Sequence, residues 1–368
     1  MTLAINALGT RINVEFFNMR EPNIRAIRRA WDGCAADPGS SADHTIHVGL
    51  LPTPQNLDQV VAARTVAEVS ELLSQRVTAL AIDAQHERHL LLHAAGILVP
   101  ETGTVLALVA PSGTGKTTAA LTLARSGYCT DETVAVDRVG TVLPYPKPLS
   151  VIERKGAPKR QISPAQAGLT SVTDRHPLGG IVLLERNPAA KTPQIESLDM
   201  IDALTLIAPQ VSYLSARQRP LHQLRDLVHS VGGAHRIRYA EAADLTRMLA
   251  RLANPSEVRP VYGHSERPDA PHPLSESSKP SHAGAYARET IIDVLHVGGA
   301  ELVLNGRNLT LLSEVGTAIW GVLEHPQQIE ELGDALGVTD LELLRTRVDE
   351  LISAGILRQN HITESDTA

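Results

Sequence analysis

A proline-rich stretch interrupts the sequence from residue 254 to about residue 285 and predicts a chain in two parts. It contains several serines and histidines, hardly any aliphatic residue, and six prolines: Pro255, Pro260, Pro268, Pro271, Pro273 and Pro280. A segment of this composition buries too little apolar surface to offset the entropy lost on ordering. We therefore expect an extended, mobile, protease-sensitive linker over residues 254–285, whose two neighbours move independently.

The composition of the chain excludes several classes of protein. Hydrophobic residues make up 43% of its 368 residues, enough for two or three cores. The formal net charge of −7 provides no basic field for non-specific nucleic-acid binding. No apolar run reaches the roughly 18 residues that a membrane span needs. Cys34 and Cys129 have no metal-ligand spacing and the start has no signal-peptide pattern, so we expect a cytoplasmic protein that binds neither nucleic acid nor membrane.

Upstream of the linker, short apolar runs alternate with helical patterns, which is typical of an α/β domain. A helix is expected from near Lys116 to Gly127. Residues 1–85 either form their own domain or complete the sheet of residues 86–253. Residues 21–31 have the pattern of a basic amphipathic helix, with an ordinary solvated surface as the alternative interpretation of its arginines. The expected strands are residues 77–82, 90–99, 104–110, 133–137 and 180–184.

A glycine-rich loop with the sequence Ala110-Pro-Ser-Gly-Thr-Gly-Lys-Thr117 joins one of these strands to the expected helix. Gly113 and Gly115 permit backbone angles that turn N–H groups toward a phosphate. Lys116 supplies a positive charge for the β and γ oxygens, and Thr117 offers a hydroxyl to Mg²⁺. The loop therefore predicts a P-loop that binds ATP or GTP, with Ala110 replacing the first glycine of the usual pattern. The residues expected to hold the nucleotide are Pro111, Ser112, Gly113, Thr114, Gly115, Lys116, Thr117 and Thr118.

Two acidic residues, Asp131 and Glu132, directly precede the strand 133–137. We expect this strand beside the P-loop strand in a parallel sheet, which brings both carboxylates to the phosphate end. One can then organise Mg²⁺ while the other accepts a hydroxyl proton. The alternative is a turn aspartate and a solvated glutamate. Glu185, which closes the apolar run 181–184, is a further metal-side candidate, with an ordinary strand-end charge as its alternative.

His93 and Asp137 are two further candidates for a role beside the glycine-rich loop. His93 lies in the apolar segment 90–96, on the strand before the P-loop strand, and a tight turn at residues 101–103 joins the two. A lone histidine in an apolar strand is usually a satisfied core residue, whereas a hairpin here would point it at the loop. Asp137 follows an apolar run as a Walker-B aspartate does, but we expect it at the far end of its strand.

The segments 91–96, 111–117 and 131–132 together resemble the HPr kinase/phosphorylase-like group, whose P-loop is shared with phosphoenolpyruvate carboxykinase. The resemblance extends over residues 77–253. This chain has Asp-Glu where those enzymes carry paired aspartates. The resemblance therefore leaves open which role belongs to Asp131 and which to Glu132. It also shows no signature for binding the HPr carrier protein.

The resemblance implies an α/β P-loop kinase domain that transfers a phosphoryl group in line from Mg-ATP to a serine hydroxyl. It implies Asp131 as general base, His93 as its partner or as a phosphate contact, and Lys116 as a nucleotide ligand. The predicted catalytic residues are thus Asp131, His93 and Lys116, and the predicted metal ligands are Thr117, Asp131, Glu132 and Glu185.

Downstream of the linker, residues 286–360 predict a small α+β, winged-helix-like module, followed by a tail at 361–368. Strands are expected at 290–297, 300–304 and 309–312. Three helices follow: Ser313 caps the first, Gly337 ends the second, and Thr339 with Glu342 forms a capping box for the third. The inward side chains expected on the first helix are Val315, Ala318, Ile319, Val322 and Leu323.

This module is similar to PqqD-like domains, the peptide-recognition elements of ribosomal-peptide maturation systems. The segments 300–305, 312–320 and 344–357 carry the likeness, which implies that a leader peptide is added as a strand at the sheet edge. Residues 286–368 contain five arginines, no lysine and fourteen acidic residues, a formal charge of −9. Such a charge repels nucleic acid and accepts a peptide with basic or apolar side chains.

Together these features predict a kinase that phosphorylates a Ser or Thr hydroxyl of a leader or precursor peptide held by residues 286–360, with ATP and Mg²⁺ as cofactors. Tethering would raise the local concentration of the peptide. One alternative is a nucleotide-binding scaffold that presents a leader peptide to another enzyme. Another is a kinase of a free metabolite. The sequence leaves open whether the chain forms a homo-oligomer.

Overall fold

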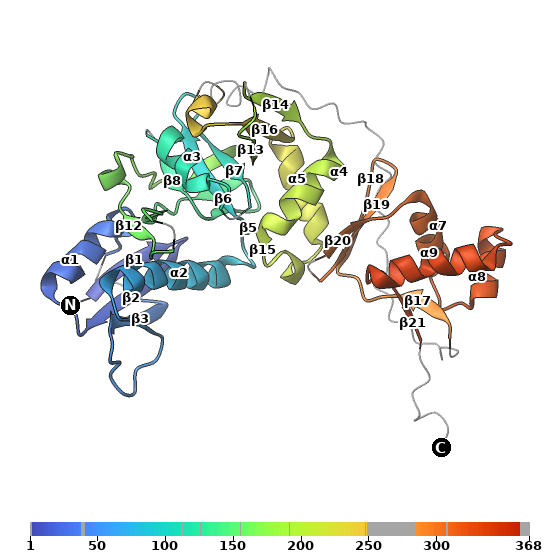
Figure 1. The fold of residues 1–368 in the computed structure, drawn as a ribbon, viewed down its shortest axis with the longest axis horizontal. Coiled ribbons are helices and arrows are strands. Elements are labelled where there is room, and N and C mark those ends of the chain that lie inside the picture. The colour runs from blue at the N-terminus through green and yellow to red at the C-terminus, as the bar shows by residue number, and fades with distance from the viewer. Residues whose placement is uncertain are drawn as a thin grey trace. The chain divides into compact units, whose positions relative to one another are not determined.

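The elements of the computed structural model are drawn in Figure 1. The predicted tail and all but the last two residues of the predicted linker lie outside the described residues. The described part is a mixed α/β fold with several sheets, and none of its helices is long and apolar enough to cross a bilayer. The structure describes residues 2–37, 41–111, 113–125, 127–154, 156–190, 192–246, 248, 284–306 and 308–360.

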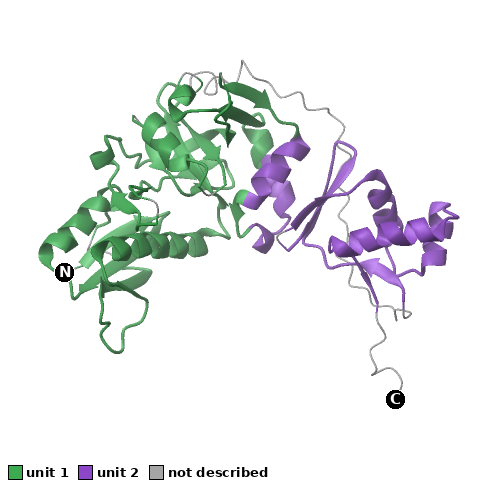
Figure 2. Ribbon diagram, viewed as in Figure 1, with its two compact units in different colours: residues 1–199, 210–213, 227–260 green, residues 200–209, 214–226, 261–368 purple. Residues whose placement is uncertain are grey.

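Contacts divide the described residues into two compact units, shown in Figure 2. As far as they are described, unit 1 takes in residues 1–199, 210–213 and 227–260, and unit 2 takes in 200–209, 214–226 and 261–368. Two pieces of the region 86–253 therefore group with the C-terminal residues.

The N-terminal part of unit 1 is a four-stranded sheet in the order β1-β2-β3-β4. Its first two strands form an antiparallel hairpin, and the other two add in parallel. Helix α1 has Ile24, Ile27 and Ala30 on its buried face and arginines on the other, as the sequence predicts. The elements are β1 (Thr2–Ala7), β2 (Thr10–Phe17), α1 (Glu21–Ala30), β3 (His44–Leu50), β4 (Val60–Ala63) and α2 (Val66–Gln85).

Residues 77–82, predicted as a strand, lie inside helix α2, which runs along the N-terminal sheet (Figure 1). The helix begins at a capping box between Thr65 and Glu68. Its buried residues, among them Val69, Leu73, Val77 and Ala81, recur at helical spacing. A six-residue apolar window is too short to distinguish a strand from a buried helix, so the prediction was wrong.

A ten-stranded sheet forms the centre of unit 1, with the main path β15-β5-β9-β10-β13-β7-β6-β8 and with β16 and β14 beyond β13. Only the pairs β13–β7 and β13–β16 within it are parallel. Its strands are β5 (Leu90–Leu92), β6 (Ala94–Val99), β7 (Thr104–Val109), β8 (Tyr128–Thr130), β9 (Val134–Val136), β10 (Thr141–Leu143), β13 (His176–Arg186), β14 (Gln194–Ser197), β15 (Val211–Ser212) and β16 (Ala234–Tyr239). A separate two-stranded sheet joins β11 (Leu149–Val151) to β12 (Arg160–Ile162).

Three expectations from the sequence, two about this sheet and one about the helix that follows β7, are wrong. Strand β9 pairs antiparallel with β5 and β10 and is no neighbour of the P-loop strand β7. The run 90–99 is broken at His93 into β5 and β6, which pair with different strands. Helix α3 (Lys116–Leu123) ends four residues before Gly127. Apolar runs show where strands lie, whereas strand order depends on pairings between distant residues.

The N-terminal sheet and the central sheet share one hydrophobic core. This core joins the N-terminal elements to Leu91, Ala135, Leu143 and Tyr145 of the central region. The Tyr145 hydroxyl also forms a buried hydrogen bond of 2.9 Å with Thr78 Oγ1 of α2. Residues 1–85 therefore build their own sheet and share a core with the central sheet.

Unit 2 contains α4 (Met200–Ile207), most of α5 (Pro220–Ser230) and the C-terminal module. The Asp293 carboxylate of the module accepts hydrogen bonds from Leu221 N at 2.8 Å and contacts His222 Nδ1 at 3.2 Å. The module consists of β17 (Tyr286–Arg288), β18 (Asp293–Val297), β19 (Ala300–Asn305), β20 (Asn308–Leu311), α7 (Glu314–Val322), α8 (Ile329–Leu336), α9 (Leu341–Ser353) and β21 (Leu357–Gln359). Its main sheet has the order β18-β19-β20, and β17 pairs with β21.

The helix signals of the module are largely confirmed. Ser313 Oγ accepts from Gly316 N, and Gly337 ends α8 in the left-handed conformation. Two details differ. Asp340, one residue after the predicted Thr339, caps α9 through Leu343 N. Val315 and Ala318, both predicted to face inward, are exposed, because the buried face of α7 is formed by Gly316, Ile319 and Trp320.

The contact between the N-terminal part and the loop at Pro146 predicts the effect of Gly33→Ala. An added Cβ would lie 2.5 Å from Pro146 O, so backbone must move. We expect the free energy of unfolding in urea to fall by about 1–3 kcal/mol. Gly321→Ala in α7 is the control, because its Cβ meets nothing within 4 Å and alanine favours a helix. Equal effects of the two substitutions would contradict the prediction.

Candidate functional site

The glycine-rich loop follows β7 and leads directly into α3. Gly113 and Gly115 have φ values of +81° and +102°, which only glycine adopts without strain. Thr114 Oγ1 donates to Pro111 O at 2.6 Å and closes the loop. The loop thus has the left-handed turns and the helix N-terminus that the sequence predicts. Ser112, predicted to hold the nucleotide, lies outside the described residues.

Lys116 is a buried residue at the start of α3. Its Nζ donates to Ala110 O at 2.6 Å and to Pro111 O at 3.1 Å. Burial lowers the pKa of the ammonium, and the negative charges of Glu132 and Asp131 oppose that shift. The ammonium therefore lies along the loop, close to both predicted acidic residues.

Asp131 is almost completely buried, with its side chain 1% exposed. Thr117 Oγ1 donates to its Oδ2 at 2.9 Å, and Tyr128 Oη donates to its Oδ1 at 3.0 Å. Asp131 reaches the loop because β8, which ends one residue before it, pairs with β6. The expected proximity of Asp131 and Thr117 is present, but through β8 and not through a parallel β9.

Lys147 is a site residue that the sequence analysis missed. Its side chain is 1% exposed, and its Nζ lies 3.3 Å from Asp131 Oδ1 and 3.8 Å from Glu132 Oε2. The same ammonium donates to Pro148 O at 3.0 Å, and the Lys147 carbonyl accepts from Tyr128 Oη. Lys147 is the single charged residue in the run 145–149, Tyr-Pro-Lys-Pro-Leu, all of which is buried. A lysine inside an otherwise apolar run was the signal that could have found it.

His93 lies where β5 ends and β6 begins, with its Nδ1 3.7 Å from Glu132 Oε1. Its backbone N–H donates to Gln210 O at 2.7 Å, which fixes the chain at the break between the strands. Burial lowers the pKa of the imidazole, the nearby Lys116 lowers it further, and Glu132 opposes the shift. Glu132 itself is 38% exposed. The His93–Glu132 pair therefore offers the accessible carboxylate, in contrast to buried Asp131.

Glu185 does not join this cluster in the structure. Its carboxylate forms ion pairs with Arg236 Nε at 3.5 Å and with Arg238 Nε at 3.2 Å, both on β16. These contacts match the alternative given for Glu185 from the sequence, an ordinary charge at the end of a strand. Asp137 accepts hydrogen bonds from Val139 N and Thr141 N in the turn after β9, and so lies at the far end of its strand as expected.

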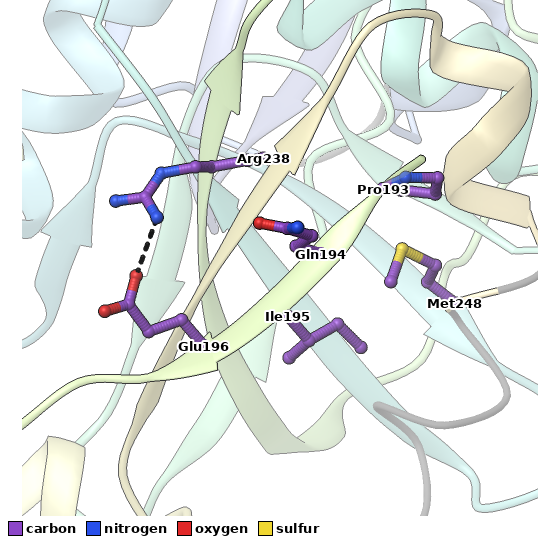
Figure 3. A pocket seen from close by; sticks show the side chains of 6 residues that line it. All are labelled: Pro193, Gln194, Ile195, Glu196, Arg238 and Met248. Carbon is purple, nitrogen blue, oxygen red and sulfur yellow. Dashed lines mark ion pairs between the residues drawn. The ribbon is translucent and has the colours of Figure 1, made fainter. Parts of the chain in front are cut away.

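Arg238, one of the two arginines that hold Glu185, also lines a hollow of about 410 Å³ beside the edge strand β14. Figure 3 shows Arg238 paired with Glu196, at 3.3 Å, near the apolar side chains of Ile195 and Met248. Glu196 also pairs with Arg236. Because each carboxylate of this ladder contacts two guanidinium groups, we interpret it as a strand-to-strand ion-pair network.

The cluster of Lys116, Thr117, Asp131, Glu132, Lys147 and His93 thus combines predicted residues with one new residue. Among the residues that the structure describes, no group of three or more histidine, cysteine or acidic side chains could by itself hold a metal ion. Any cation here must therefore use hydroxyl or ligand oxygens as well. No protein-family model matches the chain, and no curated protein sequence matches it.

The electrostatic surroundings of His93 predict that it titrates below pH 6.5, the ordinary value, in the metal-free and nucleotide-free chain. Since the folded state binds this proton less readily, the histidine's contribution to stability is present above about pH 6.5 and is lost as the pH falls through the lower folded pKa. NMR titration of the imidazole, assigned with His93→Gln, measures this. Lys116→Met should raise the pKa, and a midpoint at or above 6.5 in the unmodified chain would contradict the prediction.

The burial of Lys147 predicts a large cost when its charge is removed. Lys147→Met leaves Asp131 buried without its ammonium partner, so the free energy of unfolding in urea should fall by about 3–5 kcal/mol. Adding Asp131→Asn removes the uncompensated charge and should restore part of that loss. Lys159→Met, at an exposed lysine, is the control and should change stability by less than about 0.5 kcal/mol. If the double variant were no more stable than Lys147→Met, the ion pair would not explain the burial of Lys147.

Proposed function

We propose that this chain is an ATP- and Mg²⁺-dependent phosphotransferase that acts on a Ser or Thr hydroxyl of a peptide. The observation that carries the proposal is the hydrogen bond between Thr117 Oγ1 and Asp131 Oδ2, beside a second carboxylate, Glu132. Phosphoryl transfer requires this combination of a phosphate-binding loop, a metal-side acid and a proton acceptor. It requires little other covalent chemistry from the protein.

The backbone and the side chains of the glycine-rich loop both support nucleotide binding. The N–H groups at the start of α3 and the left-handed glycines suit a phosphate chain. Lys116 would exchange its contacts with two loop carbonyls for phosphate oxygens. The Thr117 hydroxyl and the Asp131 carboxylate are hard oxygen donors that fit Mg²⁺. When bound there, Mg²⁺ would supply positive charge to the phosphate oxygens.

The contacts of the two acids support a division of labour between them that the sequence left open. Both Asp131 oxygens already accept hydrogen bonds, and the side chain is buried, which suits a metal-side and positioning role. Glu132 is more exposed and contacts His93. We therefore assign Glu132, in place of Asp131, as the base: the acceptor oxygen bonds to the γ-phosphorus, the bond to the β–γ bridging oxygen breaks, the hydroxyl proton passes to the Glu132 carboxylate, and ADP leaves.

Unit 2 supports a peptide as the acceptor. Strand β20 forms one edge of its sheet, and its outer side pairs with no other described strand. Large apolar side chains are exposed on and near it, at Leu311 and at Val315 of α7. An unpaired edge with neighbouring apolar side chains suits an added strand, and the acidic character of the module favours basic residues in that strand.

The proposal predicts transfer of label from [γ-³²P]ATP to members of a synthetic peptide library, each with one Ser or Thr and with flanking basic residues. Glu132→Gln should lower kcat by about 10²–10⁴-fold with little change in ATP affinity, because it removes the proton acceptor. Asp131→Asn should instead weaken binding of Mg-ATP. Phosphorimaging of the peptides and calorimetry with ATP measure the two effects.

The control variant is Asp137→Asn, which alters an aspartate at the opposite end of β9 and should leave transfer unchanged. ATP binding without label on any peptide would contradict a peptide kinase and support the scaffold alternative. Loss of transfer in Asp131→Asn with full activity in Glu132→Gln would return the role of base to Asp131.

A further inference from the structure

A second hollow, of about 520 Å³, lies in unit 1 among the residues that the structure describes. It is lined by segments from five places in the chain: the β1–β2 turn, the end of α2 with the residues that follow it, the β9–β10 turn, the end of β10, and the residue before β13. Arg88, Arg138 and Arg175 come from three of these segments. The hollow is thus formed where the N-terminal sheet meets the central sheet.

The strand directions place this hollow away from the glycine-rich loop. Arg175 immediately precedes β13, which runs parallel to β7, so it lies near the end where β7 begins. The glycine-rich loop follows the other end of β7, a strand of six residues. Six residues in a strand span about 20 Å. A ligand in this hollow would therefore not be bound by the residues of the proposed phosphotransfer site.

The charges around the hollow are unusual for an acidic protein. None of Arg88, Arg138 and Arg175 forms an ion pair with another described residue, although the chain has 41 acidic and 34 basic residues. Two acids, Glu87 and Asp137, also line the hollow. Asp137 Oδ1 accepts hydrogen bonds from two backbone N–H groups of its own turn, and in the described part of the chain no ion pair joins its carboxylate to Arg88, Arg138 or Arg175. The arginines thus keep donors available for an anion.

Part of the lining of the hollow is apolar, although seven of its eleven lining residues are polar or charged. Leu8 is fully buried in the β1–β2 turn with φ +53°, a conformation that is costly for a leucine, and Gly9 beside it has φ +81°. Leu143 of β10 also lines the hollow. Val139 at the rim is 85% exposed. A ligand that contacts both the arginines and the apolar side chains of Leu143 and Val139 must carry an apolar body and a negative group.

We propose that this hollow, defined by Arg88, Arg138, Arg175 and the apolar side chains of Leu143 and Val139, binds a small organic anion such as a phosphate monoester. Arginine forms bidentate hydrogen bonds with phosphate oxygens, and three guanidinium groups favour a dianion over a monoanion. The volume suits a small molecule and not a peptide strand. The site is independent of the proposed function, since it uses none of the residues of the glycine-rich loop.

Calorimetry with phenyl phosphate as the probe tests this proposal on the full chain carrying Lys116→Met. That substitution weakens phosphate binding at the glycine-rich loop, so the remaining heat reports the hollow. We expect a Kd of about 0.1–1 mM. Inorganic phosphate should bind more weakly because it lacks the apolar body, and phenol should not bind because it lacks the charge.

Arg138→Gln with Arg175→Gln should weaken phenyl phosphate binding by at least about tenfold, since a hydrogen-bonded charge contributes about 1.5–3 kcal/mol. Val139→Asp, which keeps every arginine and alters an exposed side chain, should weaken it as well. Arg345→Gln on α9 is the matched control and should leave binding unchanged. Circular dichroism checks the fold of each variant. Absence of binding up to about 10 mM, or equal binding by the double variant and the control, would overturn the proposal.

Discussion

The buried contact between Lys147 and Asp131 is the interaction on which the candidate site depends. A carboxylate that is 1% exposed would be strongly unfavourable without a compensating charge, and the ammonium 3.3 Å away supplies it. With that charge balanced, Asp131 can accept from both Thr117 and Tyr128. The ion pair thereby holds the start of α3, the end of β8 and the loop before β11 in one arrangement.

The N-terminal sheet supports this arrangement from the other side. The loop that carries Lys147 also contains Tyr145, which hydrogen-bonds to Thr78 of α2, and Pro146, which packs closely against Gly33. These contacts come from residues whose role the sequence left open. They indicate that the first 85 residues support the acidic pair. These residues also supply one wall of the hollow lined by Arg88, Arg138 and Arg175, the arginine-lined hollow.

The two ends of β5 connect the principal features of unit 1. His89, which lines the arginine-lined hollow, directly precedes this strand, and His93 directly follows it. Gln210, whose carbonyl accepts from the His93 backbone N–H, belongs to a short segment between α4 and α5 that is grouped with His93 in unit 1. A three-residue strand therefore separates a proposed anion site from the histidine that contacts Glu132.

The sequence by itself determined the features that depend on neighbouring residues. The glycine-rich loop, the β6–β7 hairpin and the caps at Ser313 and Gly337 follow from local backbone preferences and short-range hydrogen bonds. The tertiary structure alone decided the order of the strands, the helical state of residues 77–82, the contact of Glu185 with arginines and the inclusion of Lys147. Those outcomes depend on burial and on charge pairs between residues far apart in the chain, and a local pattern contains no information about which distant partner is present.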